Sequence, residues 1–330
     1  MTKNLAVYWV IFSMLLSGCG YASSSLTHRE DVKAFIDKMA GQHGFSRENL
    51  VELFKNVRIK DAIIRAMSRP AESKPWHVYR SLFISERQID AGLEFWLSNV
   101  ASLAEAERQT GVPAEIIVAI LGVETRYGDN AGSYRVIDAL ATLAFDYPKR
   151  GVFFAGELEQ FLILCREEQI DPLQPVGSYA GAMGIPQFMP SSFRTFAKDQ
   201  DHDGRRDIWN NNRDAIASVA NYFSEHGWIK GGPVTFPAII QGDGFRSFLS
   251  TGLKPNTSLS LMQAAGINIP AGIDLNQDAR LLQLDNEYGP SYWVTLANFY
   301  VITRYNHSAL YAMAVYQLSR EILYRKETRA

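Results

Sequence analysis

The chain has 330 residues, of which 47% are hydrophobic and 21% charged, and its formal net charge at pH 7 is −2. A chain of this length predicts roughly two or three compact units. The composition is that of a globular protein, and the small net charge gives no electrostatic reason to expect a nucleic-acid partner.

Residues 1–18 have the features of an export signal. Lys3 precedes an apolar run, Leu5 to Leu16, that is too short to span a bilayer comfortably. The following LSGC resembles a bacterial lipobox, in which Cys19 is lipidated and becomes the first mature residue. Several acyl chains would anchor the protein stably, because each buried CH₂ contributes ~0.8 kcal/mol. Plain secretion with cleavage nearby is the alternative.

The residue after the lipidated cysteine indicates a compartment. Gly20 stands there instead of aspartate. By resemblance to Gram-negative lipoproteins, this is compatible with sorting to the outer membrane. We therefore expect the protein at the periplasmic face of the outer membrane, with Cys19 acylated. Cys165 then has no intrachain partner, and we expect it to be a buried, inert thiol with no disulfide.

Helical periodicity dominates the remaining chain. Amphipathic patterns separated by polar breaks predict three short helices between Ser23 and Ser73, and Ser46 and Asn49 frame the start of one. From Gly231 short apolar runs separated by Pro, Gly and Asn indicate strands and turns. The further predicted helices cover 84–111, 113–125, 136–144, 153–168, 214–223 and 293–322.

Glu124 is a carboxylic acid on the apolar face of a predicted helix. The helix begins near Pro113, Glu124 follows Ile120 by four residues, and Gly128 is the expected residue past the helix end. Apolar surroundings and the negative end of the helix dipole both disfavour an ionised carboxylate, so its pKa should be raised. A carboxyl group protonated near neutral pH can act as a general acid. An ion pair with Arg126 is the alternative.

A glycine- and proline-rich segment, 177–190, excludes a regular helix. Three glycines and two prolines in 14 residues predict a tight turn or hairpin whose backbone approaches another group closely. Interleaved Ser178, Tyr179 and Gln187 suit a sugar-lined groove, because hydroxyl and amide groups bond to ring hydroxyls. A structural loop packed on the Glu124 helix is the compatible alternative.

The segment 199–210, DQDHDGRRDIWN, has the oxygen-ligand spacing of an EF-hand loop. Its four carboxylates repel one another unless a cation lies among them, although a solvated acidic turn is the alternative. Arg206 stands where an aliphatic residue is usual, and Asn210 replaces the usual bidentate glutamate. We therefore expect weak, structural calcium binding. The predicted ligands are Asp199, Asp201, Asp203, the carbonyl group of Arg205, Asp207 and Asn210.

Four segments in order, ETRYG, DALATLAFDYPKR, GSYAGAMGIPQFMPSSF and DAIASVANYF, resemble the lytic murein transglycosylases of the membrane-bound B type. These are lysozyme-like enzymes that cleave peptidoglycan. The resemblance runs from about Trp76 to the C-terminus and includes a single calcium loop at this position. It implies that Glu124 is the sole catalytic acid and base. It also implies a glycan groove lined by Tyr79, Ser178, Gln187, Tyr222, Tyr305, Asn306 and Tyr311, although Tyr311 on a helix packed against the core is an alternative.

Pattern and resemblance together predict an α+β, predominantly α-helical fold with a lysozyme-like core. A helical satellite domain and a small β domain accompany the core, which carries the EF-hand-like loop. The expected divisions are a lipoprotein signal peptide (1–18), an N-terminal helical domain (19–73) joined by 136–170, the catalytic core (74–135 and 171–230), a small β domain (231–290) and a C-terminal helix returning to the core (291–330).

A single carboxyl group constrains the predicted chemistry. Most glycosidases use two carboxylates. One suffices if the C6 hydroxyl of N-acetylmuramic acid attacks C1 of its own ring and closes a 1,6-anhydro bridge. We therefore predict non-hydrolytic cleavage of the β-1,4 bond between N-acetylmuramic acid and N-acetylglucosamine. The alternatives are a hydrolytic muramidase with Asp129 as second carboxylate and a non-catalytic peptidoglycan-binding lipoprotein.

The predicted partners are peptidoglycan glycan strands and, through acylated Cys19, outer-membrane lipid. We expect a monomer that needs no organic cofactor. Cell-wall enzymes are the class of protein partner that the resemblance suggests.

Overall fold

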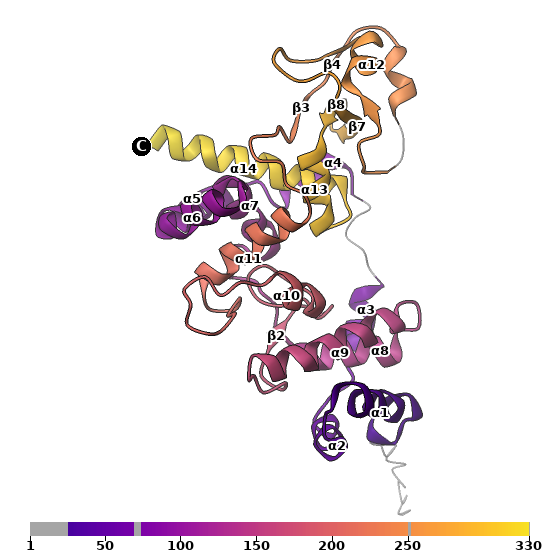
Figure 1. Cartoon of the computed structure of the whole chain (residues 1–330). Coiled ribbons are helices and arrows are strands. Elements are labelled where there is room, and N and C mark those ends of the chain that lie inside the picture. Colours follow the sequence, from indigo (N-terminus) through magenta and orange to yellow (C-terminus); the bar gives the residue numbers. More distant parts are fainter. Residues whose placement is uncertain (1–25, 69–73, 250–251, 330) are drawn as a thin grey trace, which may run out of the picture. The chain divides into compact units, whose positions relative to one another are not determined.

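The computed structural model describes residues 26–68, 74–249 and 252–329 (Figure 1). The predicted signal peptide and Cys19 lie outside these residues. The chain forms two compact units, one ending at Lys55 and one running from Asn56 to the C-terminus. The second unit contains every described residue to which the sequence assigned a site. Within the described ranges, no helix has the length and apolar character needed to cross a membrane.

The first unit is helical, as predicted. Its second helix begins where Ser46 and Asn49 indicated, because the Ser46 hydroxyl accepts a hydrogen bond of 3.1 Å from the Asn49 N–H. Phe35 and Phe54 pack edge to face with ring centroids 5.9 Å apart, and this contact joins the two longer helices. The elements are η1 (Leu26–His28), α1 (Glu30–His43) and α2 (Arg47–Lys55).

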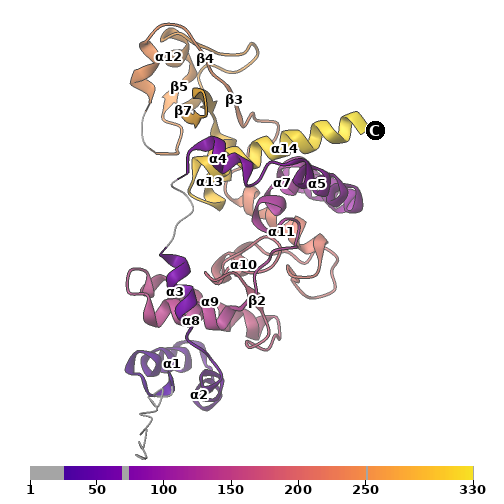
Figure 2. The ribbon, with the colours of Figure 1, turned by 180° about the vertical axis from the view of Figure 1, so that it is seen from behind.

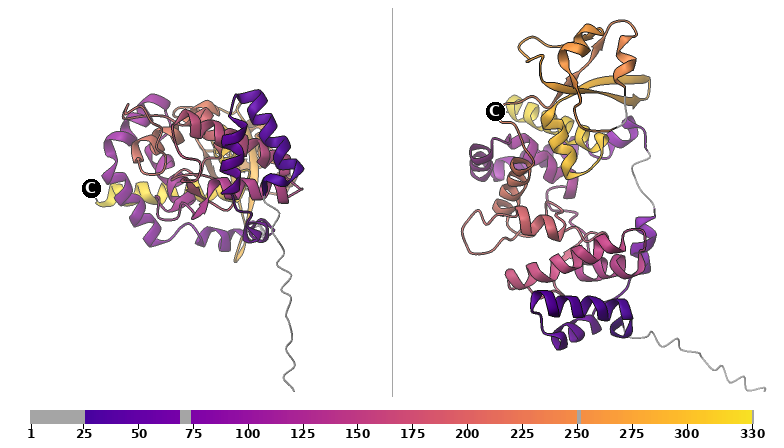
Figure 3. Two further views of the ribbon diagram at one scale, coloured as in Figure 1. Left: turned by 90° about the horizontal axis from the view of Figure 1, so that it is seen from below. Right: turned by 45° about the vertical axis from the view of Figure 1, so that its right-hand side comes forward.

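The second unit is built around helix α7. Its residues are apolar on every face and nearly all are buried, which is typical of a helix enclosed by others. Helices α14 and α5 pack along it (Figure 2), and α8 lies beside α9 (Figure 3). The helices are α3 (Asp61–Met67), α4 (Trp76–Ser81), α5 (Glu86–Ser98), α6 (Val100–Thr110), α7 (Ala114–Thr125), α8 (Val136–Asp146), α9 (Gly151–Glu167), α10 (Pro190–Phe196), α11 (Asn212–Glu225), α13 (Ala297–Tyr305) and α14 (Ala309–Arg329).

Two predicted helices are interrupted. The helix expected over 84–111 breaks at Asn99, whose side chain donates a 2.8 Å hydrogen bond to the Phe95 carbonyl, so that a side chain competes with the backbone ladder. The helix expected over 293–322 begins later and is divided between α13 and α14. Trp293 belongs to a strand instead, because its backbone pairs with Leu282 and Pro237.

Antiparallel strands follow α11, as the short apolar runs after Gly231 predicted. The longest pair, β7 and β8, forms a hairpin visible in Figure 3, and the sheet order is β3-β8-β7-β5. The apolar run at 259–264 is helical instead of extended, and it packs on the buried side of the sheet with Leu281 and Val294. The elements are β3 (Thr235–Pro237), β4 (Ile239–Ile240), η3 (Gly244–Phe248), β5 (Thr257–Ser258), α12 (Leu259–Ala264), β6 (Ile267–Asn268), β7 (Asp278–Asn286) and β8 (Gly289–Thr295).

The glycine-rich segment is a tight loop, as predicted. Its start is fixed by a short antiparallel pair, β1 (Tyr134–Arg135) with β2 (Val176–Gly177). Within the loop Met183 pairs with Phe188. Gly184 has φ +66°, and a Cβ atom there would lie 2.5 Å from the carbonyl oxygen of Ile208. Only glycine permits this close approach of two backbones without displacement.

We expect Gly184→Ala to destabilise the protein by more than Gly231→Ala. Gly231 is the matched control, because it has φ +71° and a Cβ atom there would meet no other atom within 4 Å. Gly231→Ala therefore carries only the left-handed backbone cost of ~1 kcal/mol, whereas Gly184→Ala adds a backbone clash. Denaturant unfolding of both variants measures the difference. Equal losses would contradict the close-approach argument.

Candidate active site

Helix α7 ends immediately after Glu124 in a left-handed turn. Arg126 and Tyr127 have φ of +53° and +62°. Their N–H groups donate to the carbonyls of Gly122 (3.0 Å) and Leu121 (3.1 Å), which satisfies the last turn of the helix. The residues directly past the helix end are therefore Arg126 and Tyr127, and Gly128, which the sequence led us to expect there, follows them. Non-glycine residues in this conformation cost free energy and concentrate at functional sites.

The carboxyl group of Glu124 has an altered acidity. Burial among protein atoms raises its pKa to about 7, as the sequence predicted, although a part of the side chain remains open to solvent. The Tyr311 hydroxyl donates a hydrogen bond to Glu124 Oε1, and this bond opposes the rise by stabilising the carboxylate. Arg126 is exposed, and the side-chain partner found for Glu124 among the described residues is the Tyr311 hydroxyl. The alternative of a structural ion pair was therefore wrong.

Tyrosines surround this carboxyl group. Burial raises the pKa of Tyr305 and Tyr311 well above their usual range, and the nearby Glu124 adds to the effect, so both hydroxyls stay protonated donors. Tyr305 donates to the Pro186 carbonyl at 2.5 Å. Tyr79 is buried and lies close enough to Tyr311 to influence its pKa.

Tyr222 joins the same aromatic group. Its ring centroid lies 4.8 Å from that of Tyr305, and its hydroxyl donates to the Arg304 carbonyl at 2.7 Å. The structure thus brings together Glu124 and four tyrosines from separate segments of the chain, namely Tyr79, Tyr222, Tyr305 and Tyr311. Asn306 follows directly as the residue that ends α13.

The glycine-rich loop is bonded to the end of α7. The buried Thr125 hydroxyl donates to the Ile185 carbonyl at 2.8 Å. Gln187, at φ +54°, donates through Nε2 to the carbonyls of Ala131 (3.1 Å) and Gly184 (2.9 Å). The Ser178 hydroxyl accepts bonds from two N–H groups within the loop. Ser178 and Gln187 therefore hold the loop in shape beside Glu124.

Other carboxylates of the second unit are either exposed or already bonded to structural partners. Asp129, the predicted candidate for a second catalytic carboxylate, is exposed in the turn after α7. Asp138 accepts two bonds from Arg135 and one from the Arg58 N–H. Glu157 accepts bonds from the N–H and hydroxyl of Ser191. Buried carboxylates that are fully bonded in this way are unsuited to proton transfer.

The acidic loop brings three of its predicted ligands together. Carboxylate oxygens of Asp199, Asp201 and Asp203 lie within 4.8 Å of one another. The Oδ1 atom of Asp201 is buried and has no hydrogen-bond partner in the described part of the chain. Such an orphaned carboxylate oxygen beside two others suits a hard cation. Asp207 is not part of this group of carboxylates, and its side chain accepts bonds from the backbone of the following turn and from the Asn210 amide (3.2 Å).

The sequence did not predict the structural roles of two residues in this region, Arg206 and Asp214. Arg206, the departure from the EF-hand pattern, turns away from the loop and pairs with Glu168. Asp214 accepts bonds from the N–H groups of Gln200 (2.8 Å) and Asp207 (2.9 Å), so that it ties both ends of the loop to α11. Its place in the first turn of a helix, where acids are favoured, was the available signal.

Comparisons with known proteins identify the family of this chain. The family model described as "Transglycosylase SLT domain" matches residues 27–320. Membrane-bound lytic murein transglycosylase B of Escherichia coli (strain K12) is 45% identical over 302 residues, which cover 88% of this chain and 82% of that protein.

Three solved structures are similar. Soluble lytic transglycosylase SltB1 from Pseudomonas aeruginosa has TM-score 0.86 and 50% identity, and the match covers 90% of this chain and 99% of that one. Escherichia coli Slt35 in complex with calcium has TM-score 0.83 and 45% identity, with 90% and 94% covered. Pseudomonas aeruginosa SltB3 in complex with NAG-anhNAM-pentapeptide has TM-score 0.79 and 31% identity, with 87% and 77% covered. With its family model spanning most of its length and its active-site helix, loop and tyrosines in one cluster, this chain belongs to the SLT-domain lytic transglycosylases.

Proposed function

We propose that Glu124 is the one acid and base of this peptidoglycan lytic transglycosylase. The observation that carries the proposal is a carboxyl group with a pKa of about 7 at the end of an apolar helix, bonded to the Tyr311 hydroxyl. With this pKa, both the acid and the carboxylate are populated near neutral pH, as a group that first donates and then accepts a proton requires.

The reaction proceeds by two proton transfers at the same carboxyl group. Glu124 protonates the β-1,4 glycosidic oxygen as the bond from that oxygen to C1 of N-acetylmuramic acid breaks. The C6 hydroxyl of the same sugar forms the new bond to C1, and its proton passes to the Glu124 carboxylate. The acid is regenerated, a 1,6-anhydro ring is formed and no water is consumed.

The exposed position of Asp129 favours this route over hydrolysis. A retaining glycosidase needs a second carboxylate ~5 Å from the acid, and an inverting one needs it at ~6.5 to 9.5 Å. The buried acids Asp138, Glu157 and Asp214 have their oxygens bonded elsewhere. The anhydro sugar in the SltB3 complex supports the same product class for this chain.

Substrate contacts belong to the groups around Glu124. We propose that Tyr79, Tyr222, Tyr305 and Asn306 line the glycan groove, and that Ser178 and Gln187 form its wall through the loop that they stabilise. Tyr311 has a different task. Because its hydroxyl is used by Glu124, it positions the acid instead of binding sugar.

We propose that the acidic loop binds calcium through Asp199, Asp201 and Asp203, together with the Arg205 carbonyl. The close approach of these carboxylates and the orphaned Asp201 oxygen support this, as does the calcium complex of Slt35. The ion would neutralise the carboxylates and stabilise the loop.

We also propose the domain divisions that the sequence predicted and a lipid anchor at the N-terminal end of the mature chain. A lipid anchor at Cys19 on the periplasmic face of the outer membrane is supported by the LSGC sequence and by the membrane-bound relative.

Replacing Glu124 with glutamine should lower turnover of purified peptidoglycan by at least ~10³-fold while glycan binding is retained, because only the proton donor is lost. Mass spectrometry of the products provides the measurement, since anhydro ends weigh one water less than reducing ends. Asp129→Asn is the matched control and should keep both the rate and the anhydro ends. Reducing ends in the wild-type digest, together with an inactive Asp129→Asn, would establish hydrolysis instead.

We expect Tyr311→Phe to raise the pKa of Glu124 further, because the lost hydrogen bond stabilised the carboxylate. Since the acid must be protonated, the decline of kcat/KM at alkaline pH should move to higher pH. Tyr305→Phe is the control, because that hydroxyl donates to the Pro186 carbonyl. A pH–rate profile for the three proteins measures the shift, and an unmoved profile in Tyr311→Phe would be evidence against the assigned contact.

Calcium should raise the melting temperature of the wild-type protein, by the equivalent of about 2–3 kcal/mol at a hundred times Kd. Asp201→Asn should abolish the increase, whereas Asp243→Asn, an exposed acid of the β region, should retain it. Thermal scans with calcium and with chelator give the result. An unchanged response in Asp201→Asn would remove this residue from the ligand set.

A further inference from the structure

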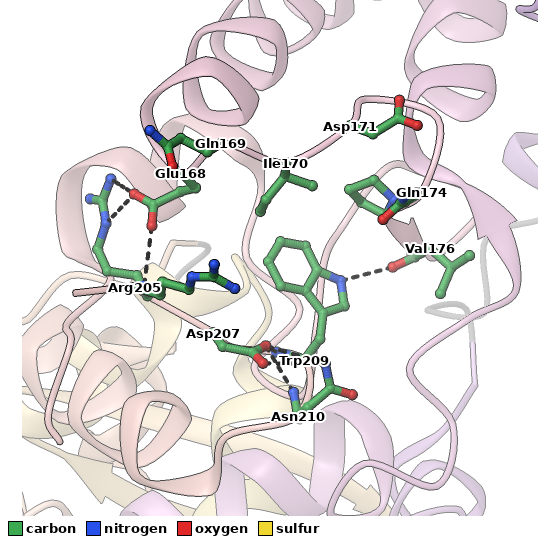
Figure 4. Close-up of a pocket in the computed structure, with 12 residues that line it drawn as sticks. Glu168, Gln169, Ile170, Asp171, Gln174, Val176, Arg205, Asp207, Trp209 and Asn210 are labelled. Atoms are coloured by element: carbon green, nitrogen blue, oxygen red, sulfur yellow. Dashed lines mark hydrogen bonds and ion pairs between the residues drawn. The ribbon is translucent and has the colours of Figure 1, made fainter. Parts of the chain in front are cut away.

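A cavity of about 610 Å³ lies between the C-terminal end of α9, strand β2 and the loop that follows the acidic cluster (Figure 4). Neither Glu124 nor any of the tyrosines around it lines this cavity. Its volume lies within the range of ~300 to 1,000 Å³ that is usual for small-ligand sites. The reaction proposed at Glu124 does not use this cavity.

One side of the cavity is apolar and rigid. Figure 4 shows the Ile170 side chain directed toward the indole ring of Trp209. The indole N–H donates to the Val176 carbonyl at 3.0 Å, and the Trp209 backbone N–H donates to Asp207 at 2.9 Å. Two bonds therefore fix a flat aromatic surface that is only partly covered.

The polar side of the cavity offers two charges of opposite sign. Arg205 is exposed, and no side-chain hydrogen bond or ion pair of this arginine occurs among the described residues. Asp171, on the segment after α9, is also exposed and uses only Oδ1, which accepts the Leu173 N–H at 2.9 Å. The neighbouring Arg206 and Glu168 neutralise each other. Asp207 also lines the cavity, but both of its carboxylate oxygens accept bonds from Trp209 and Asn210. Arg205 and Asp171 are thus the charged side chains that keep donor or acceptor atoms for a ligand.

We propose that this cavity binds the peptide stem of peptidoglycan, a proposal that rests on the function proposed for Glu124. The free C-terminal carboxylate of a stem peptide matches Arg205, and an amine-bearing side chain within the stem would match Asp171. The aliphatic side chains of the stem match the Trp209 surface. A neutral sugar can offer hydroxyl groups to Arg205 and Asp171 but no opposite charge, and charge-assisted pairs are the stronger ones. The charge pattern therefore favours peptide over glycan.

The cavity shares its supporting loop with Glu124. Val176 precedes the glycine-rich loop, and Trp209 follows Ile208, whose carbonyl accepts the Ile185 N–H at 2.8 Å. The Ile185 carbonyl in turn accepts the Thr125 hydroxyl, next to Glu124. An extended stem of five residues reaches ~17 Å, and the hydrogen bonds of Ile185 and Thr125 connect the backbone beside the cavity to the residue next to Glu124.

The test measures binding to protein that carries Glu124→Gln, so that ligands stay intact. Isothermal titration calorimetry compares a NAG-NAM-pentapeptide with the same disaccharide lacking the peptide. We expect Asp171→Asn and Arg205→Gln each to weaken binding of the peptide-bearing ligand by about tenfold and to leave the peptide-free ligand unaffected. Arg205→Gln retains the backbone carbonyl, and Asp171 lies outside the acidic loop, so agreement between the two variants excludes an indirect effect on that loop.

Arg108→Gln, the loss of an exposed arginine on α6, is the matched control and should change neither affinity. Equal losses for both ligands, or no loss for the peptide-bearing one, would overturn the proposal. Turnover of peptide-free glycan strands by the wild-type protein tests the proposed function separately. A negative result in the calorimetry would therefore contradict the peptide site alone. A lack of turnover would contradict the function proposed for Glu124.

Discussion

Enclosure of α7 by neighbouring helices is the constraint on which the site depends. Because every face of this helix is apolar, it is buried by α5, α11 and α14, and the carboxyl group at its end is carried into the same environment. Desolvation then raises the pKa of Glu124 to about 7. Packing around the helix therefore raises the pKa of Glu124, and one hydrogen bond from Tyr311 of α14 limits the rise.

This arrangement reduces stability over a defined pH range. Below its ordinary pKa of 4.5, Glu124 is protonated in both the folded and the unfolded chain and costs nothing. As the pH rises toward 7, the unfolded chain gains from ionisation while the folded chain does not, so folding loses on the order of 3 kcal/mol. Above pH 7 the loss remains constant. The left-handed Arg126 and Tyr127 add local strain at the same helix end.

Hydrogen bonds link the end of α7 to the glycine-rich loop and to the acidic cluster. Thr125 joins α7 to the glycine-rich loop, and Ile185 joins this loop to the segment after the acidic cluster. Asp214 then anchors that segment to α11. The acid, the loop and the acidic cluster therefore belong to one bonded series, so a cation in the cluster would stabilise backbone that also supports the groove.

The sequence by itself determined the helical class, the strand-rich region after Gly231, the tight loop at 177–190 and the raised pKa of Glu124, because each depends on local pattern or on glycine and proline chemistry. It also named the family through four motifs. Only the tertiary structure decided the helix breaks at Asn99 and after Tyr305, the partner of Glu124 and the grouping of three aspartates without Asp207. These depend on which side chains from distant segments meet, and spacing along the chain carries no information about distance across a packed core.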